Sequence, residues 1–377
     1  MKGTSLELNT GTRVVRAGLT LSAVASLAAC GAVNEQPGFA ADSRGGSGDQ
    51  QLSGTLNGAG SSAQQAAMQG WTAGFSLLQP DVTVNYDPVG SGGGREQFLA
   101  GGVDFAGSDS ALDDDELTQA EERCGDAGVF EMPNYISPIA VIYNLEGVDE
   151  LNLSPETVAG IFAQKITTWN DPAIAEDNPD ADLPDTAITP VNRADDSGTT
   201  KNFTEYLSAV AADVWTDEPD GVWPVDGGEA AQGTSGVVAA VAAGNGAIGY
   251  ADLSQAGDLG VANIGVGDEF VTPSPEAAAA VVENSESAGD AGEYNFAIEL
   301  NRDTAGSGEY PIVLVSYHVG CIEYEDQATA DLVKDFMSYV VSEEGQQAAA
   351  QAAGSAPISD GLRDQAQSAI DAITGTA

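Results

Sequence analysis

Residues 52–78 read LSGTLNGAGSSAQQAAMQGWTAGFSLL. Apolar and polar side chains alternate from Leu52 to Asn57, which predicts a strand, and the glycine-rich stretch at 58–60 predicts a turn. Beyond the turn, apolar residues recur at the spacing of one helical face, so Ser61 and Ser62 fall at the amino end of a predicted helix. That face consists of Ala63, Ala66, Ala67, Trp71, Phe75 and Leu78.

Two further segments repeat the order strand, turn, helix. A strand predicted over 82–86 is followed by the turn VGSGGG at 89–94, which places Ser91 at the start of a second helix. A third strand, predicted over 188–192, leads into RADDSGTT at 193–200 and then into a helical face. The repeated pattern predicts an α/β fold.

All three helix starts offer the same chemistry. Each presents unpaired backbone N–H groups, a Ser or Thr hydroxyl and small residues that let a ligand approach the backbone. Such a helix start binds anions through its free N–H groups and the positive end of the helix dipole. Taken alone, Ser62 or Ser91 is better explained as a helix cap than as a ligand-binding residue. Three such starts in one chain, one preceded by Arg193, indicate a site for a small tetrahedral oxyanion.

Asp109 follows a strand predicted within 102–108 and is explained, taken alone, as a turn or cap residue. If it faces the anion, its ionised carboxylate can only accept hydrogen bonds, so the ligand must bring a proton. Hydrogen phosphate carries that proton at neutral pH, whereas sulfate does not. Sites built around such a hydrogen bond discriminate by about 10⁴-fold or more.

Composition excludes several functions. The 377 residues include 58 Asp or Glu and 12 Lys or Arg, a formal net charge of -46. A chain this acidic has no basic surface for nucleic acid or anionic lipid. Hydrophobic residues make up 42%, which fits a folded protein of one large or two ordinary domains. The low lysine content is similar to that of salt-adapted proteins. An anion-binding function would have to work against the field of the whole molecule.

The amino terminus has the layout of an export signal. Basic residues precede a short apolar run over 17–29, which is too short to span a membrane. The run ends in Leu-Ala-Ala-Cys, which resembles a bacterial lipobox, so Cys30 is the candidate lipidation site; the alternative is an ordinary cysteine beside an ordinary signal peptide. We predict a lipoprotein signal peptide at 1–29 and a flexible tether at 30–51. After cleavage 9 basic and 57 acidic residues remain, a net charge of -48.

The remaining cysteines, Cys124 and Cys321, are predicted to pair as a structural disulfide, since an exported protein meets an oxidising environment. His318 is the only histidine and is predicted to be a surface or packing residue. No metal signature, CxxC, Walker A sequence or GxSxG elbow is present. The acidic run at 113–116 is predicted to open a helix, and the acidic residues of 176–182 an exposed loop. We therefore expect no cofactor and no metal.

Five sequence blocks also carry a resemblance to a known family. In order, they are GAGSSAQQAAMQGW (58–71), VGSGGGREQFLAGGVDFAGSDSAL (89–112), KITTWNDPAI (165–174), VNRADDSGTT (191–200) and GTSGVVAAVAAGNGAIGYAD (233–252). Together they resemble the phosphate-binding protein of the bacterial phosphate-specific ABC transporter, from about Gly58 to Pro357.

The resemblance implies a set of ligand-binding residues: Ser62, Ala63, Ser91, Asp109, Arg193, Ser197, Gly198 and Thr199. It also implies that Asp195 orients the arginine. The position of Ala63 is commonly aromatic or larger in the family. Because that position contributes its backbone N–H, we expect binding to survive the difference.

The resemblance further implies a periplasmic-binding-protein fold of type II, in which two α/β lobes joined by hinge strands close on the ligand. The apolar run 135–143 would form the first crossover and Ala247–Tyr250 the return. We expect lobe I to combine 52–143 with 256–377, and lobe II to hold 144–255. The predicted binding residues then divide between the two lobes.

The expected function is capture of inorganic phosphate outside the cytoplasm and delivery to an ABC permease, by a monomer anchored to the outer face of the cytoplasmic membrane through lipid on Cys30. No catalysis and no nucleic acid are expected. One alternative is a binding protein for sulfate or molybdate, against which Asp109 discriminates. A second alternative is a secreted phosphatase with Ser197 or Ser91 as nucleophile, although the sequence offers no general base or metal cluster to activate either serine. A third is an adhesin or phosphate sensor on the same scaffold.

Overall fold

The computed structural model describes residues 51–289 and 292–376. The predicted signal peptide at 1–29, the lipidation site Cys30 and all of the predicted tether except Gln51 lie outside the described residues. Within the described residues, no helix is both long and apolar enough to cross a membrane.

Most strands join one nine-stranded sheet. Its strands are β1 (Gly54–Gly60), β2 (Val82–Asp87), β3 (Phe105–Ser108), β4 (Val129–Asn144), β6 (Thr189–Arg193), β7 (Glu229–Ala231), β8 (Ala247–Asp252), β9 (Gly260–Val261) and β14 (Val313–Cys321). The order is β2-β1-β3-β14-β4-β8-β6-β7, with β9 also paired to β4. The pairs of β1 with β2 and β3 are parallel, and so are those of β6 with β7 and β8, whereas β14 and β4 run antiparallel to their neighbours.

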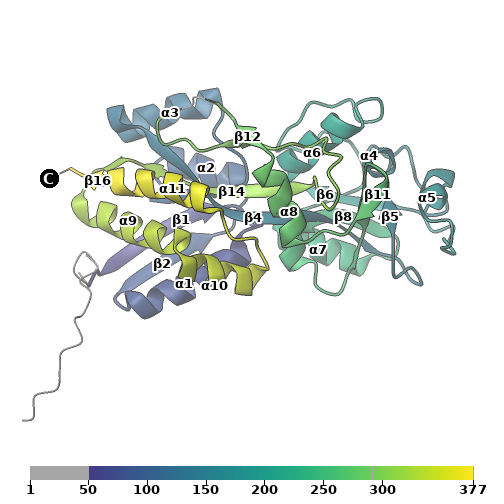
Figure 1. The fold of residues 1–377 in the computed structure, drawn as a ribbon, viewed down its shortest axis with the longest axis horizontal. Coiled ribbons are helices and arrows are strands. Elements are labelled where there is room, and N and C mark those ends of the chain that lie inside the picture. The colour runs from purple at the N-terminus through teal and green to yellow at the C-terminus, as the bar shows by residue number, and fades with distance from the viewer. Residues whose placement is uncertain (1–50, 290–291, 377) are drawn as a thin grey trace, which may run out of the picture. The chain divides into compact units, whose positions relative to one another are not determined.

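Strand β4 belongs to both ends of this sheet. Its residues 129–138 pair with β14, and its residues 139–144 pair with β8. Nearly all of β4 is buried, which suits its run of aromatic and β-branched side chains. The predicted crossover at 135–143 lies within β4, and the predicted return lies within β8. We call the β1, β2, β3 and β14 side of β4 the first lobe and the β6, β7 and β8 side the second lobe (Figure 1).

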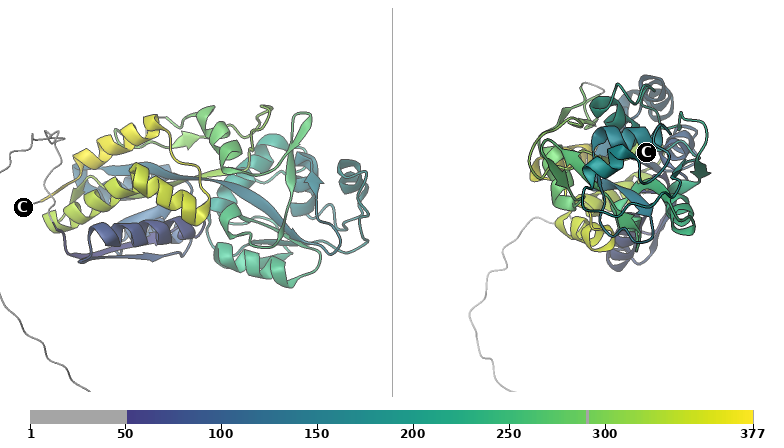
Figure 2. Two further views of the ribbon diagram at one scale, coloured as in Figure 1. Left: turned by 60° about the horizontal axis from the view of Figure 1, so that its bottom comes forward. Right: turned by 90° about the vertical axis from the view of Figure 1, so that its right-hand side faces the viewer.

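Helices cover the sheet on both sides (Figure 2). They are α1 (Gln65–Leu78), α2 (Ser91–Leu99), α3 (Asp114–Cys124), α4 (Pro155–Phe162), α5 (Pro172–Asp177), α6 (Gly198–Val210), α7 (Gly233–Ala243), α8 (Pro275–Glu283), α9 (Gln327–Val341), α10 (Glu343–Ala353) and α11 (Asp360–Ala372). In the first lobe α1 packs against α10 and α9, and in the second lobe α7 packs against β6 and β8. The predicted acidic helix start is α3, where Asp113 and Glu116 form a capping box.

Short strands form three further small sheets. β5 (Asn152–Leu153), β10 (Asn263–Val266) and β11 (Glu269–Val271) make one; β12 (Glu286–Ser287) pairs with β13 (Ile298–Glu299), and β15 (Glu323–Tyr324) pairs with β16 (Thr374–Gly375). The last pair contacts α9 of the first lobe. After β8 the chain pairs β9 with the second-lobe part of β4 and β10 with β5. Residues 260–264 thus pair with parts of the 139–153 segment, and β11 pairs with β10.

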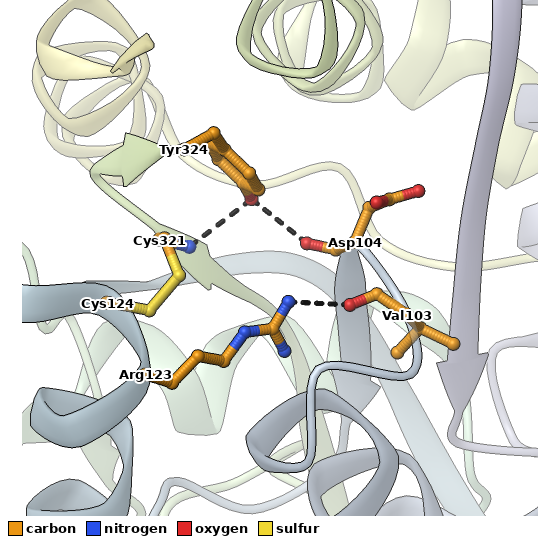
Figure 3. The surroundings of a disulfide bond; sticks show 6 residues. All are labelled: Val103, Asp104, Arg123, Cys124, Cys321 and Tyr324. Atoms are coloured by element: carbon orange, nitrogen blue, oxygen red, sulfur yellow. Dashed lines mark hydrogen bonds between the residues drawn. A yellow bond between two sulfur atoms is a disulfide. The ribbon is translucent and has the colours of Figure 1, made fainter. Parts of the chain in front are cut away.

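A disulfide joins Cys124, at the end of α3, to Cys321, at the end of β14 (Figure 3). These are the two cysteines for which the sequence predicts a bridge, and their Cα atoms lie 5.3 Å apart. Tyr324 Oη accepts from the Cys321 N–H (3.2 Å) and donates to the Asp104 carbonyl (3.0 Å). The disulfide therefore holds α3 to β14, and the Tyr324 hydroxyl joins the end of β14 to the loop that precedes β3.

His318 lies in the apolar core of the first lobe. The side chain is completely buried, its Nδ1 lies 3.2 Å from Met337 Sδ, and its ring contacts Trp71, Phe105 and Phe336. The interpretation of His318 as a packing residue is therefore confirmed, and the surface alternative is wrong. Burial lowers the pKa of His318 to about 3, since the charged ring would lose its hydration.

This burial predicts a pH dependence. An unfolded chain protonates His318 near pH 6.5, whereas the folded chain resists protonation down to about pH 3. The stability that the neutral ring contributes is complete above pH 6.5 and falls by about 1.4 kcal/mol per pH unit as the pH decreases below that value. We expect the single histidine signal in the NMR spectrum of tag-free protein to stay unchanged between pH 8 and about 4.5. A midpoint near 6.5 would contradict the buried position.

Candidate functional site

The three predicted helix starts converge at one place in the structure. The first lobe contributes the turn before α1, the start of α2 and the end of β3, and the second lobe contributes the end of β6 and the start of α6. The polar side chains there are almost fully buried. They are Ser62, Ser91, Asp109, Arg193, Ser197 and Thr199.

The turn before α1 is held by Ser61. Its Oγ accepts from the N–H of Ala63 (3.1 Å) and of Gln64 (3.4 Å), so the N–H predicted to bind a ligand is engaged locally in this arrangement. Ser62 reaches the other lobe instead, where its Oγ accepts from the N–H of Thr234 (3.0 Å) and contacts the Thr234 hydroxyl (3.0 Å). The first helix start is thereby fixed to the start of α7.

The second helix start is fixed to β3. Ser91 Oγ accepts from the Asp109 N–H at 3.1 Å. Within α2, a Cβ added to Gly94 would lie 2.3 Å from the Gly60 Cα, so glycine at this position lets the helix rest on the end of β1. Arg95, the next residue, binds Glu116 (2.8 Å) and the hydroxyl groups of Ser108 and Ser110 in its own lobe, and its Nη2 lies 3.8 Å from Asp196 Oδ2 in the second lobe.

Asp109 stands at the boundary between the lobes and is 3% exposed. Its Oδ1 accepts from Ser316 Oγ (2.6 Å) in the first lobe, and its Oδ2 accepts from Thr199 Oγ1 (3.2 Å) in the second. Burial raises the pKa of Asp109, while hydrogen bonds, first that of Ser316, and the charge of Arg193 oppose the rise. Both hydroxyl groups donate to the carboxylate, an arrangement that suits its ionised form.

Arg193 is the last residue of β6 and forms an ion pair with Asp195, two residues later. The guanidinium donates from Nε to Asp195 Oδ1 (2.8 Å) and from Nη2 to Oδ2. Asp195 Oδ1 also accepts from the Gly233 N–H at 3.0 Å. This two-pronged pairing fixes the plane of the guanidinium and leaves its Nη1 side for another acceptor. Asp195 is therefore positioned to orient the arginine, the role implied by the family resemblance.

The third helix start approaches the first lobe most closely. Ser197 caps α6, since its Oγ accepts from the Thr200 N–H at 3.2 Å. A Cβ added to Gly198 would lie 2.7 Å from the Asp109 Cβ and 2.7 Å from Ser91 Oγ. Only glycine lets this helix start come so near to both residues. The start of α6 thus faces the carboxylate and hydroxyl of the opposite lobe.

Sequence reasoning missed several residues of this cluster. Thr234 opens α7, and its Gly-Thr-Ser-Gly context is a fourth helix start of the type that the sequence showed three times. Ser316 gave no signal, because it lies inside an apolar strand. Asn202 lies in α6 and donates to the Asp109 carbonyl at 2.6 Å. Tyr250, in β8, contacts the Thr200 hydroxyl at 2.7 Å.

Within residues 51–289 and 292–376, no three His, Cys, Asp or Glu side chains are grouped so that they could hold a metal ion. The carboxylates of the cluster have hydrogen-bond donors as partners, as described for Asp109 and Asp195. What the arrangement offers is N–H groups, hydroxyl groups, one oriented guanidinium and one carboxylate, which can bind a protonated oxyanion.

The family model that matches this chain is described as a PBP superfamily domain and covers residues 45–344. The chain is 35% identical over 323 residues to phosphate-binding protein PstS 3 of Mycobacterium tuberculosis, covering 85% of this chain and 86% of that protein. It is 33% identical over 359 residues to phosphate-binding protein PstS 3 of Mycobacterium leprae, covering 94% and 96%.

Solved structures agree on the fold. A high-affinity periplasmic phosphate-binding protein bound with phosphate, PfluDING, aligns with a TM-score of 0.67 at 24% identity, covering 84% of this chain and 93% of that chain. A phosphate-binding protein from Stenotrophomonas maltophilia aligns with a TM-score of 0.64 at 22% identity over the same shares. These matches confirm the predicted α/β fold of two lobes joined by hinge strands.

The close approach of Gly198 predicts the effect of a single methyl group. Gly198→Ala should fold normally, because alanine is favoured in helices, but should prevent the lobes from meeting at Asp109 and Ser91. We expect phosphate, the ligand predicted from the sequence, to bind at least about 10-fold more weakly by calorimetry.

Gly361→Ala is the matched control. Gly361 also lies in the first turn of a helix, α11, where an added Cβ would meet nothing nearer than Ser359 Oγ at 3.9 Å. Its phosphate affinity should equal that of the unmodified protein. Equal affinities for both alanine variants would contradict the proposed closeness of α6 to Asp109.

Proposed function

The chain belongs to the PBP superfamily and, within it, to the phosphate-binding proteins, and from this premise we propose that the converging helix starts hold inorganic phosphate between the two lobes. The protein is the binding component of a phosphate ABC importer and passes its ligand to a permease. The observation that carries the site assignment is the contact of Thr199 with Asp109 across the lobe boundary (3.2 Å).

In this proposal each lobe supplies some of the groups that bind the phosphate. The first lobe provides the Ser62 and Ala63 turn, the Ser91 hydroxyl and the Asp109 carboxylate. The second lobe provides Arg193, held by Asp195, and the start of α6. The α6 donors are Ser197, Gly198 and Thr199. A ligand that touches both lobes stabilises their closed arrangement by contacts that the open arrangement lacks. The Ala63 N–H would exchange its bond to Ser61 Oγ for one to the ligand.

Asp109 selects the protonation state of the ligand. Each carboxylate oxygen already accepts one hydroxyl hydrogen bond and retains a further lone pair. Hydrogen phosphate can donate its proton to that lone pair. Sulfate would place a second acceptor against the carboxylate in a site from which water is excluded. This arrangement weakens sulfate binding and accounts for a preference for phosphate of about 10⁴-fold, as in other sites of this kind. This property distinguishes phosphate from sulfate and molybdate.

We propose further that the protein catalyses no reaction. Ser91 Oγ accepts from the Asp109 N–H, and Ser197 Oγ accepts from the Thr200 N–H. In the described part of the chain, no hydrogen bond joins either hydroxyl to a histidine, lysine or carboxylate side chain that could act as a general base. Both serines therefore act as donors or caps.

The protein works outside the cytoplasm, as its relatives' role in import requires. We propose that residues 1–29 form the signal peptide, that Cys30 carries the lipid and that 30–51 forms the tether to the membrane. We propose that lobe I combines residues 52–143 with the chain after Val271, and that lobe II holds residues 144–271. The pairing of β9 with β4 and of β10 with β5 supports this division. The proposed state is a monomer.

Phosphate capture occurs against a formal net charge of -46 for the whole chain. Attraction must therefore be local, from Arg193 and the helix dipoles inside a closed site. Surface carboxylates lose their influence with added salt, since the Debye length falls from about 8 Å at 0.15 M to about 3 Å at 1 M. The low lysine content and high acid content fit a protein that works in brine.

Calorimetric titration of the mature protein tests the proposed function. Phosphate should bind, arsenate should bind because it shares the shape and protonation of phosphate, and sulfate should give no heat at the same concentrations. The proposal fails if none of the three anions gives heat or raises the melting temperature.

Asp109→Asn should reduce the difference in affinity between phosphate and sulfate, because the amide can donate a hydrogen bond to sulfate and the carboxylate cannot. Lowering the pH should have the same effect on the unmodified protein. Protonated Asp109 can donate a hydrogen bond, so the affinity for sulfate should rise as the pH falls. Because burial raises the pKa of Asp109, this rise should occur at a higher pH than for an exposed aspartate. Unchanged affinities for both anions in Asp109→Asn would remove Asp109 from the selection.

Salt dependence tests the electrostatic argument. The phosphate association rate measured by stopped flow should rise as sodium chloride is added, because the repulsion between a dianion and the acidic surface is screened. An uncharged osmolyte at equal osmolality is the control and should leave the rate unchanged or lower it. A rate that falls with salt would instead indicate net attraction of the anion.

A further inference from the structure

Asn202 bridges the two backbone segments that carry predicted phosphate ligands. It lies in the first turns of α6 and is 4% exposed. Its Nδ2 donates to the carbonyl of Gly198 (2.8 Å), in its own helix, and to the carbonyl of Asp109 (2.6 Å), in the opposite lobe. One amide group thus sets the separation between the start of α6 and the end of β3.

The other side of the Asn202 amide is held by Arg302. Arg302 Nη2 donates to Asn202 Oδ1 and to Glu205 Oε2 (3.0 Å), and both acceptors lie in α6. Nη1 of the same guanidinium donates to the Val313 carbonyl (2.5 Å) at the start of β14 and, at 3.4 Å, to the Pro311 carbonyl. Arg302 is 7% exposed, so the group is almost fully desolvated.

These contacts join elements of different lobes. Strand β14 pairs with β3 and with residues 129–138 of β4, whereas α6 contacts β8 and α4 in the second lobe. Arg302 therefore reaches from the first lobe to Asn202 and Glu205, and Asn202 reaches back to Asp109. Separation of the lobes would break the Asn202–Asp109 and Arg302–Asn202 hydrogen bonds together, while the Asn202–Gly198 bond would remain.

We propose that Asn202 and Arg302 form an interlobe clasp, which exists only while the lobes are closed and which slows the release of bound phosphate; this inference rests on the proposed function. Neither side chain needs to touch the ligand. Both are positioning residues: Arg302 fixes the orientation of the Asn202 amide, and that amide holds the Gly198 helix start against Asp109. The clasp therefore contributes to the release rate and not to the choice of anion.

A contact that forms after the ligand has entered affects dissociation more than association. Buried hydrogen bonds, one of them from a charged donor, are lost when the clasp is removed. We expect Asn202→Ala and Arg302→Gln each to raise the phosphate dissociation rate constant about 10- to 100-fold and to change the association rate constant less than about 3-fold. The ratio of phosphate to sulfate affinity should stay as in the unmodified protein, because Asp109 keeps its carboxylate.

Asn178→Ala is the matched control. Asn178 is 7% exposed, and its Nδ2 also donates to two backbone carbonyls, those of Asn152 (2.7 Å) and Ile174 (2.9 Å). All of these contacts lie within the second lobe. This variant should lose as much thermal stability as Asn202→Ala but should release phosphate at the rate of the unmodified protein.

Asn202→Asp is a second test that keeps the side-chain size. Aspartate retains the acceptor for Arg302 but loses the donors and places an oxygen near the carbonyls of Gly198 and Asp109. It should release phosphate quickly even though its pairing with Arg302 is preserved. This variant and Arg302→Gln keep the proposal testable if Asn202→Ala does not fold.

The measurement is the release of radiolabelled phosphate from the mature protein into excess unlabelled phosphate, with association followed by stopped flow. Fast release by the Asn202 and Arg302 variants, with the rate for Asn178→Ala unchanged, supports the clasp. Release at the unmodified rate by folded Asn202→Asp and Arg302→Gln overturns it, and so does equally fast release by Asn178→Ala. If the unmodified protein does not retain phosphate, the proposed function itself fails, and the two failures are thereby distinguished.

Discussion

The hydrogen bond from Thr199 Oγ1 to Asp109 Oδ2 (3.2 Å) crosses the boundary between the lobes, and the arrangement of the site depends on the carboxylate that accepts it. A buried carboxylate is costly unless donors surround it. Here Ser316 and Thr199 meet that need, and a protonated ligand can complete it. The same carboxylate would repel a ligand without a proton. In the proposed function, Asp109 thus takes part both in selecting the anion and, with other contacts such as that of Ser62 with Thr234, in holding the lobes together.

The acidity of the whole chain contrasts with the hydrogen-bond donors that face the proposed site. The chain carries a formal charge of -46, yet the converging helix starts and Arg193 face the site with positive ends. Asp195 neutralises part of Arg193 and fixes its plane, so directional hydrogen bonds matter more than total charge. The sheet makes this possible, because glycine-containing turns follow β1, β2 and β6, and the end of β3 brings Asp109 to the same place. Phosphate binding at the proposed site would thus depend on local groups, in a molecule whose overall negative charge opposes the approach of an anion.

The sequence predicted most elements because its strands, glycine-rich turns and helical faces follow regular spacing. The strands near 52–57, 82–86 and 188–192 appear as β1, β2 and β6, with ends that differ by at most three residues. The sequence did not predict β9 to β11, because these strands are only two to four residues long and carry little periodic signal. Ser316, Asn202 and Arg302 could not be found from sequence, since their roles arise from contacts over 90 or more positions of the chain.

The requirement for a proton on the ligand is tested most directly with monofluorophosphate, a dianion of nearly the same size and charge as hydrogen phosphate that has fluorine in place of the hydroxyl group. It can accept from Arg193 and the helix starts but cannot donate to Asp109. Calorimetric competition should show tight binding of phosphate and binding of monofluorophosphate weaker by about 10⁴-fold. Equal affinity for the two anions would contradict the role of Asp109 and, with it, the central claim.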